Sequence, residues 1–397
     1  MKNSYPDKTY RPEALIAENI AAYLESQQNK EVLRFITCGS VDDGKSTLIG
    51  RLLYDSKMIF EDQLVSLEGD SMKHGTQGGK LDFALLVDGL EAEREQGITI
   101  DVAYRFFSTE KRKFIVADTP GHEQYTRNMV TGASTADLAI ILVDARKGIL
   151  KQTKRHTFLV HQLGIKHFVL AVNKMDLVNY DQSIFNEIVD DYTAFTQKIG
   201  IPDFTAIPIS GFKGDNVTQS PSKETPWYSG ASLIEHLNLV ELVHTEALEQ
   251  AFRMPVQWVN RPNLDFRGFS GQIASGSVKP GSSVRLVPSG KTTKVENIVT
   301  FDGVLEEAIT GQSVTITLKD EIDCSRGDVL AAADDPPEAS DQFEVTIVWM
   351  DEISMKPGRS YWLKLGTQTV TANLKTPKYE ICVNTFEHLA AKTLELN

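Results

Sequence analysis

A glycine-spaced loop directly follows an apolar, β-branched run at residues 32–38. The residues of the loop are Gly39, Ser40, Val41, Asp42, Asp43, Gly44, Lys45 and Ser46. Its glycines permit backbone angles and a close approach that a Cβ would block, so that successive N–H groups can point at an anion. A helix predicted to begin at Lys45 adds its positive end to the same site. The pattern predicts a strand, loop and helix that bind a nucleoside triphosphate.

Lys45 and Ser46 of this loop, with one later aspartate, predict how the phosphates and a magnesium ion are bound. Lys45 would place a point charge on the β and γ phosphates, and the Ser46 hydroxyl suits Mg²⁺ as a ligand. Asp118 follows a second apolar run, 113–117, and precedes Thr119, Pro120 and Gly121. We expect this second strand to lie beside the first, so that Asp118 reaches the Mg²⁺ shell through water.

Two further strand ends predict which base is bound. Asn173, Lys174, Met175 and Asp176 follow the apolar run 167–172. The Asp176 carboxylate can accept from both N1–H and the exocyclic amine of guanine, whereas adenine offers neither donor in that arrangement. A base that leaves these acceptors unpaired in a formed pocket binds roughly 10⁴-fold more weakly. After a run at 204–209 come Ser210, Gly211 and Phe212, where a backbone N–H would reach guanine O6. The ligand is therefore expected to be GTP rather than ATP.

The order of the elements predicts the fold. Strand and helix patterns alternate from residue 31 to about 250, as in a doubly wound, mostly parallel α/β sheet, and all four loops would lie at one edge of it. Helices are expected at 122–134, 151–163 and 183–198, and Ser232 with Glu235 resembles a capping box that opens a last helix running to about residue 252. Short apolar runs between Gly-containing turns then predict β-barrel structure.

Four parts are therefore expected: an N-terminal helical extension at 1–30, a GTP-binding domain at 31–250, a β-barrel domain at 251–338 and a second β-barrel module at 339–397. The alternating Phe343, Val345, Ile347 and Trp349 would form the first strand of that last module. The polar segment 68–80 is expected to be a mobile loop that is suited to contact a partner.

Composition narrows the class of protein. The 397 residues include 41 basic and 54 acidic side chains, a net charge of −13, which does not indicate a nucleic-acid surface. No apolar run approaches the length needed to cross a bilayer. The three cysteines, Cys38, Cys324 and Cys382, are scattered and indicate neither a disulfide framework nor a zinc site. The amphipathic first thirty residues do not read as a signal peptide, so a cytoplasmic location is expected.

Several longer segments carry a family resemblance. They are GSVDDGKST at 39–47, LEAEREQGITID at 90–101, and the segments 111–114, 121–129, 144–148 and 227–230. They resemble the translational-type GTPases of the elongation factor Tu group and, within it, the GTPase large subunit of bacterial sulfate adenylyltransferase. Elongation factors usually carry His or Ser where Asp43 stands here.

The resemblance implies a division of labour between two subunits. A partner subunit of the pyrophosphate-loop ATP-sulfurylase type would join sulfate to ATP, giving adenosine 5′-phosphosulfate and pyrophosphate in sulfate assimilation. This chain would drive that uphill reaction by hydrolysing GTP, with no role for a membrane or a nucleic acid. It contains neither a Ser-Gly-Gly-x-Asp-Ser loop nor a His-x-Gly-His pair, which favours placing the sulfate chemistry on the partner.

The resemblance also implies roles for individual residues. Thr99 would close on Mg²⁺ and the γ-phosphate as a switch, and His122 would orient the attacking water. With Lys45, these two residues form the predicted catalytic group, and Thr47 belongs to the phosphate loop. The predicted Mg²⁺ ligands are Ser46, Thr99 and, through water, Asp118. For Asp42 two roles stay open, a ligand of a monovalent cation and an acceptor of backbone N–H bonds within the loop.

Two other functions remain as alternatives. One is a translation factor that delivers aminoacyl-tRNA or acts in termination, and the other is a regulatory GTPase without a coupled synthesis. The module at 339–397 is shorter than the family's, so we also expect a truncated chain or a fragment of a longer protein, with a fused adenylylsulfate kinase domain as one form of that protein.

Overall fold

The computed structural model describes residues 30–56, 83–87, 99–218, 222–241, 244–263 and 266–396, together with the single residues 67, 69, 71 and 93. The helix expected before residue 30, most of the loop at 68–80 and most of the segment 90–98 lie outside the described residues. The chain forms two compact units. The first contains the described residues up to Val240 together with Ile381–Leu389 and Leu396, and the second contains the described residues of Glu241–Glu380 together with Ala390–Glu395.

A six-stranded sheet forms the centre of the first unit, in the order β2-β3-β1-β4-β5-β6. Its strands are β1 (Val32–Cys38), β2 (Ala103–Ser108), β3 (Lys113–Asp118), β4 (Leu138–Asp144), β5 (His167–Asn173) and β6 (Thr205–Pro208). Only β2 runs antiparallel to its neighbour, and the other five strands are parallel. All seven residues of β4 are buried, as expected of a strand covered on both faces. The carboxyl ends of β1, β3, β5 and β6 therefore share one edge.

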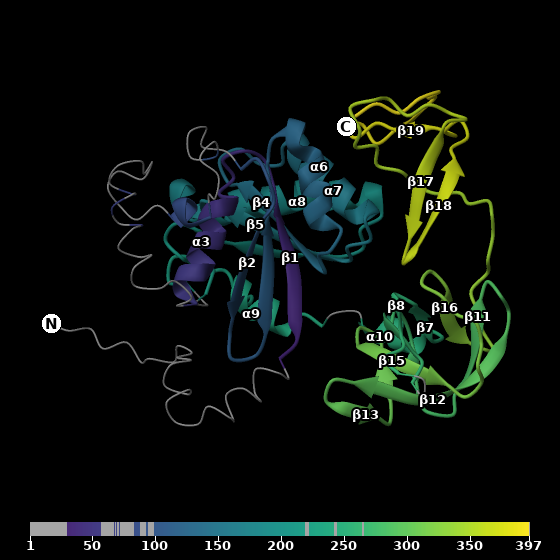
Figure 1. Cartoon of the computed structure of the whole chain (residues 1–397). Coiled ribbons are helices and arrows are strands. Elements are labelled where there is room, and N and C mark those ends of the chain that lie inside the picture. Colours follow the sequence, from purple (N-terminus) through teal and green to yellow (C-terminus); the bar gives the residue numbers. More distant parts are fainter. Residues whose placement is uncertain are drawn as a thin grey trace, which may run out of the picture. The chain divides into compact units, whose positions relative to one another are not determined.

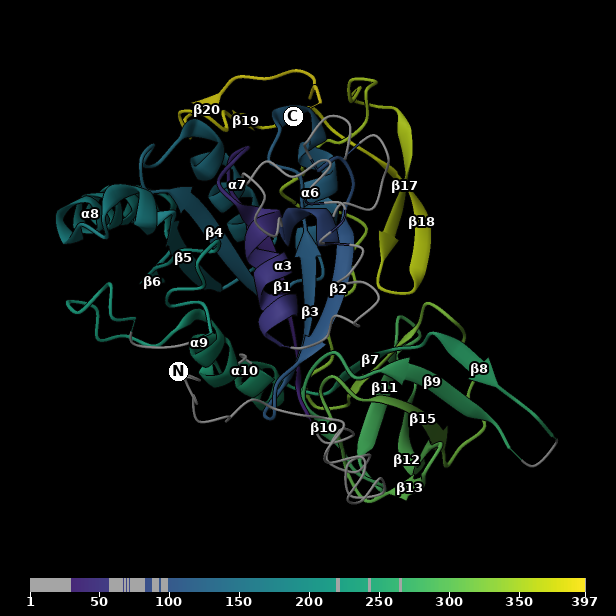
Figure 2. The same cartoon turned by 90° about the vertical axis from the view of Figure 1, so that its left-hand side faces the viewer.

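Helices cover both faces of this sheet. In Figures 1 and 2, α3 lies on one face, and α6 and α7 lie on the opposite face. The α-helices are α3 (Lys45–Asp55), α6 (Thr126–Ala133), α7 (Lys151–Gln162), α8 (Gln182–Ile199) and α9 (Leu233–Leu239), with α10 (His244–Glu249) in the second unit. The described residues also form the short 3-10 helices η1 (Phe83–Leu86), η2 (Glu123–Tyr125) and η3 (Met175–Val178).

Two of the helices predicted from sequence differ from those observed. The helix expected at 122–134 is divided into η2 and α6. The last helix begins with the predicted capping box of Ser232 and Glu235 but ends at Leu239 instead of continuing to about residue 252. A buried arginine explains this end, because Arg112 Nη1 donates to the carbonyl oxygens of Leu237 at 2.9 Å and of Val240 at 2.8 Å. These bonds satisfy carbonyl groups that a continuing helix would have used.

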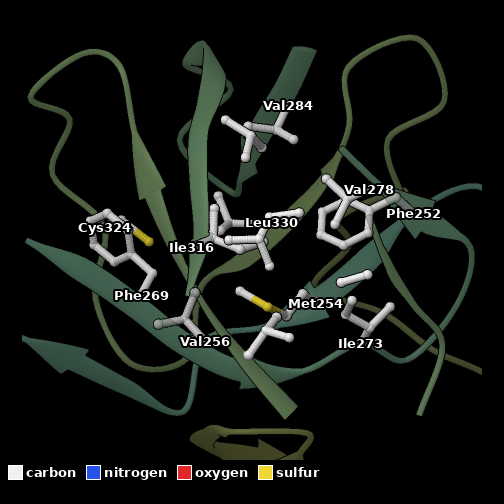
Figure 3. Close-up of a cluster of buried hydrophobic side chains, with 14 of the residues drawn as sticks. Phe252, Met254, Val256, Phe269, Ile273, Val278, Val284, Ile316, Cys324 and Leu330 are labelled. Atoms are coloured by element: carbon white, nitrogen blue, oxygen red, sulfur yellow. The ribbon is translucent and has the colours of Figure 1, made fainter. Parts of the chain in front are cut away.

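The second unit contains an eight-stranded antiparallel sheet in the order β7-β16-β11-β12-β15-β9-β8, with β13 paired to β12. A two-stranded pair, β10 and β14, lies outside that sheet. The strands are β7 (Arg253–Pro255), β8 (Trp258–Asn260), β9 (Gly268–Gln272), β10 (Ser277–Val278), β11 (Ser283–Val287), β12 (Thr292–Thr300), β13 (Gly303–Leu305), β14 (Ala308–Ile309), β15 (Ser313–Leu318) and β16 (Val329–Ala332). Side chains from alternate positions point into one shared core, drawn in Figure 3.

The C-terminal segment contains two short pairs of strands. They are β17 (Ser360–Leu365) with β18 (Gln368–Asn373), and β19 (Glu380–Ile381) with β20 (His388–Leu389). The strand expected at 343–349 is wrong, because none of these residues forms a strand or a β-bridge with another described segment, and both Phe343 and Val345 are exposed. A strand needs a paired neighbour, which an alternating pattern by itself does not supply. Among the described residues, no helix is both long and apolar enough to cross a bilayer.

The core of the second unit gives a first prediction. Leu330 is fully buried in that core, so Leu330→Ala should lower the free energy of unfolding of this unit by about 2–5 kcal/mol through lost contacts and a cavity. Limited proteolysis at increasing urea concentration measures the change. Val304→Ala, at a strand position that is 65% exposed, serves as the control and should have little effect. Equal urea midpoints for the two variants would contradict this packing.

Candidate functional site

The four loops predicted from sequence meet at one edge of the parallel sheet, and an asparagine joins three of them. Asn173 Nδ2 donates to the carbonyl oxygen of Asp43 at 2.8 Å, and Asn173 Oδ1 accepts from Gly211 N at 2.9 Å. The same oxygen accepts from Lys174 N at 2.8 Å. On the other side, Ser46 Oγ donates to Asp118 Oδ2 at 2.8 Å. Direct hydrogen bonds thus link the ends of β1, β3, β5 and β6.

The loop at 39–46 has the backbone that its glycines were predicted to allow. Gly44 adopts φ 91°, and a Cβ there would lie 2.5 Å from Asn173 Nδ2. Helix α3 begins at the next residue, and among the described side chains none caps it. Its first N–H groups are therefore free of any competing side-chain acceptor and are placed to receive an anion.

Lys45 lies buried under the loop. Its Nζ donates to the carbonyl oxygens of Ser40 at 2.8 Å and Gly39 at 3.3 Å. Burial lowers the pKa of the Lys45 ammonium, and the nearby carboxylates of Asp118 and Asp43 oppose that shift. Gly121, from the loop after β3, passes so close that a Cβ there would lie 2.8 Å from the backbone carbonyl carbon of Ser40 and 2.5 Å from Lys45 Nζ. Only a glycine allows the two loops to approach this closely.

The two adjacent aspartates of the loop occupy different environments. Asp43 is buried, and its Oδ2 accepts from Ser40 N at 2.6 Å, which closes the loop from within. Burial raises the pKa of Asp43, opposed mainly by the charge of Lys45. The Asp42 side chain is exposed, while its backbone adopts φ 67° and its carbonyl oxygen accepts from Lys174 Nζ. Of the two aspartates, it is therefore Asp43 that accepts the N–H bond within the loop.

Three side-chain oxygens predicted to serve a metal lie together. Asp118 Oδ2 accepts from Ser46 Oγ, and Thr99 Oγ1 lies 3.4 Å from Ser46 Oγ. Asp118 is buried, which raises its pKa, while the Ser46 hydrogen bond and the Lys45 charge lower it. A hard cation such as Mg²⁺ prefers oxygen ligands of this kind. The residues present therefore fit a magnesium ion with two hydroxyl groups and one carboxylate.

The residues predicted to read the base lie at the other end of the edge. Ser210 Oγ donates to Asp176 Oδ1 at 2.8 Å and accepts from Lys213 N at 3.1 Å. Phe212 lies on the same turn, where its carbonyl oxygen accepts from Arg51 Nη1 at 3.4 Å. Asp176 is half-buried, so its carboxylate is held in place and still reachable from solvent.

The position of the Lys174 ammonium group is fixed by Asp144, which the sequence analysis did not identify as a site residue. Its Nζ lies 3.1 Å from Asp144 Oδ2, and the Arg146 guanidinium approaches the same carboxylate oxygen at 2.6 Å. Burial alone would raise the pKa of Asp144, but the bonds from Arg146 and Lys174 hold it well below its usual value. The position of Asp144 at the end of β4, in line with the other strand ends, is the signal that could have identified it.

His122 lies at the start of η2 and is exposed. Its Nδ1 accepts from Gln124 N at 3.3 Å, so the imidazole caps its own turn. Thr47 and Val41 complete the predicted phosphate loop and are half-buried.

Comparisons with known proteins agree with this arrangement. The family model for the elongation factor Tu GTP binding domain matches residues 30–250, and the models for elongation factor Tu domain 2 and the GTP-eEF1A C-terminal domain-like family match residues 270–331 and 342–397. A protein of Cellvibrio japonicus (strain Ueda107) named sulfate adenylyltransferase subunit 1 is 57% identical over 383 residues, which are 96% of this chain and 81% of that protein. This chain belongs to the sulfate adenylyltransferase subunit 1 family.

Other relatives differ in their identity to this chain and in how much of their own length it covers. The bifunctional enzyme NodQ of Rhizobium sp. (strain N33) is 59% identical over 96% of this chain, which spans only 58% of that protein. A sulfate adenylyltransferase subunit 1 of Laribacter hongkongensis (strain HLHK9) is 57% identical over 96% of this chain and 79% of its own length. The GTPase-like domain of S. cerevisiae Ski7, solved with GTP, shares 16% identity at a TM-score of 0.50 and covers 96% of this chain and 92% of its own. That likeness shows the fold alone.

The joining role of Asn173 gives a second prediction. Asn173→Ala removes three hydrogen bonds, each worth about 1 kcal/mol, so local opening of the joined loops should become about 2–3 kcal/mol easier. Hydrogen exchange of peptides that cover residues 39–46 and 210–214 measures this. The matched control is Gln124→Ala, an exposed side chain on another turn of the same unit. Faster exchange in only one of the two loops, or in neither, would show that Asn173 does not join them.

Proposed function

We propose that this chain binds and hydrolyses GTP at the edge of its parallel sheet, and that the hydrolysis drives sulfate activation by a partner subunit. The observation that carries the proposal is the 57% identity over 96% of the chain to a protein named sulfate adenylyltransferase subunit 1. The geometry of the four loops supports GTP as the nucleotide.

Nucleotide binding would use the whole edge. The loop from Gly39 to Ser46 would surround the phosphates, with the N-terminus of α3 and Lys45 supplying positive charge. The base would lie between Asp176 and the turn formed by Ser210, Gly211 and Phe212. Asp176 is already oriented by the Ser210 hydroxyl, so a guanine N1–H and amine would meet a carboxylate fixed in place.

Hydrolysis would depend on the opposite end of the site. Ser46 and Thr99 directly, and Asp118 through water, would hold Mg²⁺, which when bound neutralises negative charge on the phosphate oxygens. Lys45 would stabilise charge on the transferred phosphoryl group, and His122 would orient the attacking water. Thr99 would sense the γ-phosphate, since its hydroxyl lies 3.4 Å from that of Ser46.

Sulfate activation itself would take place on the partner subunit, an ATP sulfurylase of the pyrophosphate-loop type. That subunit would form adenosine 5′-phosphosulfate and pyrophosphate from ATP and sulfate, a reaction that is unfavourable without an energy source. Coupling requires that the partner bind the GTP and GDP states of this chain with different affinity, because a ligand shifts an equilibrium only through a differential interaction.

A reconstitution tests the coupling. The chain is mixed with its pyrophosphate-loop partner, and pyrophosphate release from ATP and sulfate is measured with GTP, with GDP and with no guanine nucleotide. GTP should raise the yield of pyrophosphate and GDP should not. His122→Ala should bind GTP normally but lower both hydrolysis and the GTP-dependent yield by about 100-fold, because the attacking water loses its positioning group.

The exposed His388, on β20, provides the control, and His388→Ala should hydrolyse GTP at the rate of the unmodified chain. Pyrophosphate release that is equal with and without GTP would end the coupling proposal. An equal loss of GTP binding and hydrolysis in His122→Ala would remove the water-orienting role.

A further inference from the structure

A histidine far from the phosphate loop in sequence contacts the first amide of that loop. His156 lies on α7, its side chain is completely buried, and its Nδ1 accepts a hydrogen bond from Gly39 N at 3.3 Å. The two residues are 117 positions apart. Helix α7 packs on β4 and β1, and this packing brings the imidazole to the end of β1 where the loop begins.

The direction of this bond settles the protonation of the ring. A backbone N–H can only donate, so Nδ1 must present its lone pair and the single proton must be on Nε2. Nε2 lies 2.8 Å from Nε2 of Gln152, one turn earlier on α7. Because Nε2 of His156 carries the proton, the Gln152 amide must be rotated by half a turn so that its oxygen takes this position. With the amide oxygen turned toward the ring, Gln152 accepts that proton. Burial lowers the pKa of His156 to about 3, helped by the charges of Lys45 and Arg155, so the ring stays neutral.

The beginning of the loop has little freedom to move. A Cβ on Gly39 would lie 2.7 Å from the carbonyl oxygen of Leu142, so the backbone there is pressed against β4. The next amide, Ser40 N, donates to Asp43 Oδ2. Side chains thus take the first two N–H groups of the loop, one from α7 and one from the loop itself. Of the later N–H groups, that of Asp43 donates to the carbonyl oxygen of Ser40 at 3.4 Å. We expect the others to point at the ligand.

We propose that His156 is a positioning residue for the phosphate loop. By accepting from Gly39 N, the imidazole sets the direction in which the chain leaves β1, and hence where the amides of the following residues lie. Gln152 supports this role by fixing the tautomer. The inference deepens the proposed function, because it rests on a guanine nucleotide as the ligand of the loop.

Three substitutions separate this role from simple packing. His156→Asn places an amide oxygen near the position of Nδ1, His156→Gln places one near the position of Nε2, and His156→Leu removes the acceptor. GDP carrying a fluorescent label is bound to each full-length variant, and its dissociation is followed after excess GTP is added. Dissociation should be about 10-fold or more faster for the Gln and Leu variants, and within about threefold of the unmodified chain for Asn.

His161 on the same helix supplies the matched control. Its ring is partly buried beside Phe168, and both His161→Asn and His161→Gln should release GDP at the unmodified rate. Urea denaturation confirms that each variant is folded. If His156→Leu fails to fold, the Asn and Gln pair decides. Equal dissociation rates for that pair, or an unmodified rate for Gln, would overturn the positioning role.

A second readout needs no nucleotide and so separates this inference from the proposed function. Hydrogen exchange of the peptide that covers residues 38–46 is measured in the nucleotide-free chain. Exchange should be faster in His156→Gln than in His156→Asn, because only Asn keeps an acceptor for Gly39 N. If the unmodified chain does not bind labelled GDP at all, the proposed function fails. Equal exchange in the two variants would overturn the role of His156.

Discussion

The site depends on one side chain, the amide of Asn173 at the end of β5. Its nitrogen donates to the carbonyl oxygen of Asp43, and its oxygen accepts from the backbone N–H groups of Gly211 and Lys174. Because an amide offers both a donor and an acceptor, it can join the loop at 39–46 to the turn at 210–212, which an aspartate could not do with both bonds intact. The parallel strands bring the loops to one edge, and Asn173 fixes their spacing.

Around this junction the protein buries charges that are costly to remove from water. Lys45, Asp43 and Asp118 lie together, and burial shifts each pKa toward the neutral form, while their mutual attraction opposes the shift. Removing Lys45 would leave the two carboxylates buried without their shared opposite charge. The surrounding helices act on the same cluster: α7 contributes His156 to the loop, and Arg155 Nη1 of that helix lies 2.6 Å from Glu123 Oε1, next to His122. One helix thus contacts both the phosphate loop and the turn that carries His122.

Much of this edge could be predicted from sequence, because each contributing strand is an apolar run that ends at a short polar motif. The strand ends at Cys38, Asp118 and Asn173 were predictable for that reason. His156 was not, since nothing near it in sequence shows that α7 packs against the start of the loop. The end of α9 was missed because it depends on Arg112, and the strand at 343–349 was wrong because pairing depends on a neighbour elsewhere in the chain. Local patterns predict elements, whereas contacts between distant residues decide their ends.

We propose that Asp176, held by Ser210, selects guanine at this edge. Its most direct test is competition of GTP and xanthosine triphosphate against fluorescent GDP on the unmodified chain, on Asp176→Asn and on the exposed control Asp181→Asn. Xanthine carries a carbonyl where guanine carries its amine, so an Asn amide at position 176 can donate where the carboxylate could only accept. We expect Asp176→Asn to lose affinity for GTP and to gain affinity for xanthosine triphosphate, while Asp181→Asn keeps the unmodified preference. Unchanged GTP affinity in Asp176→Asn would contradict it.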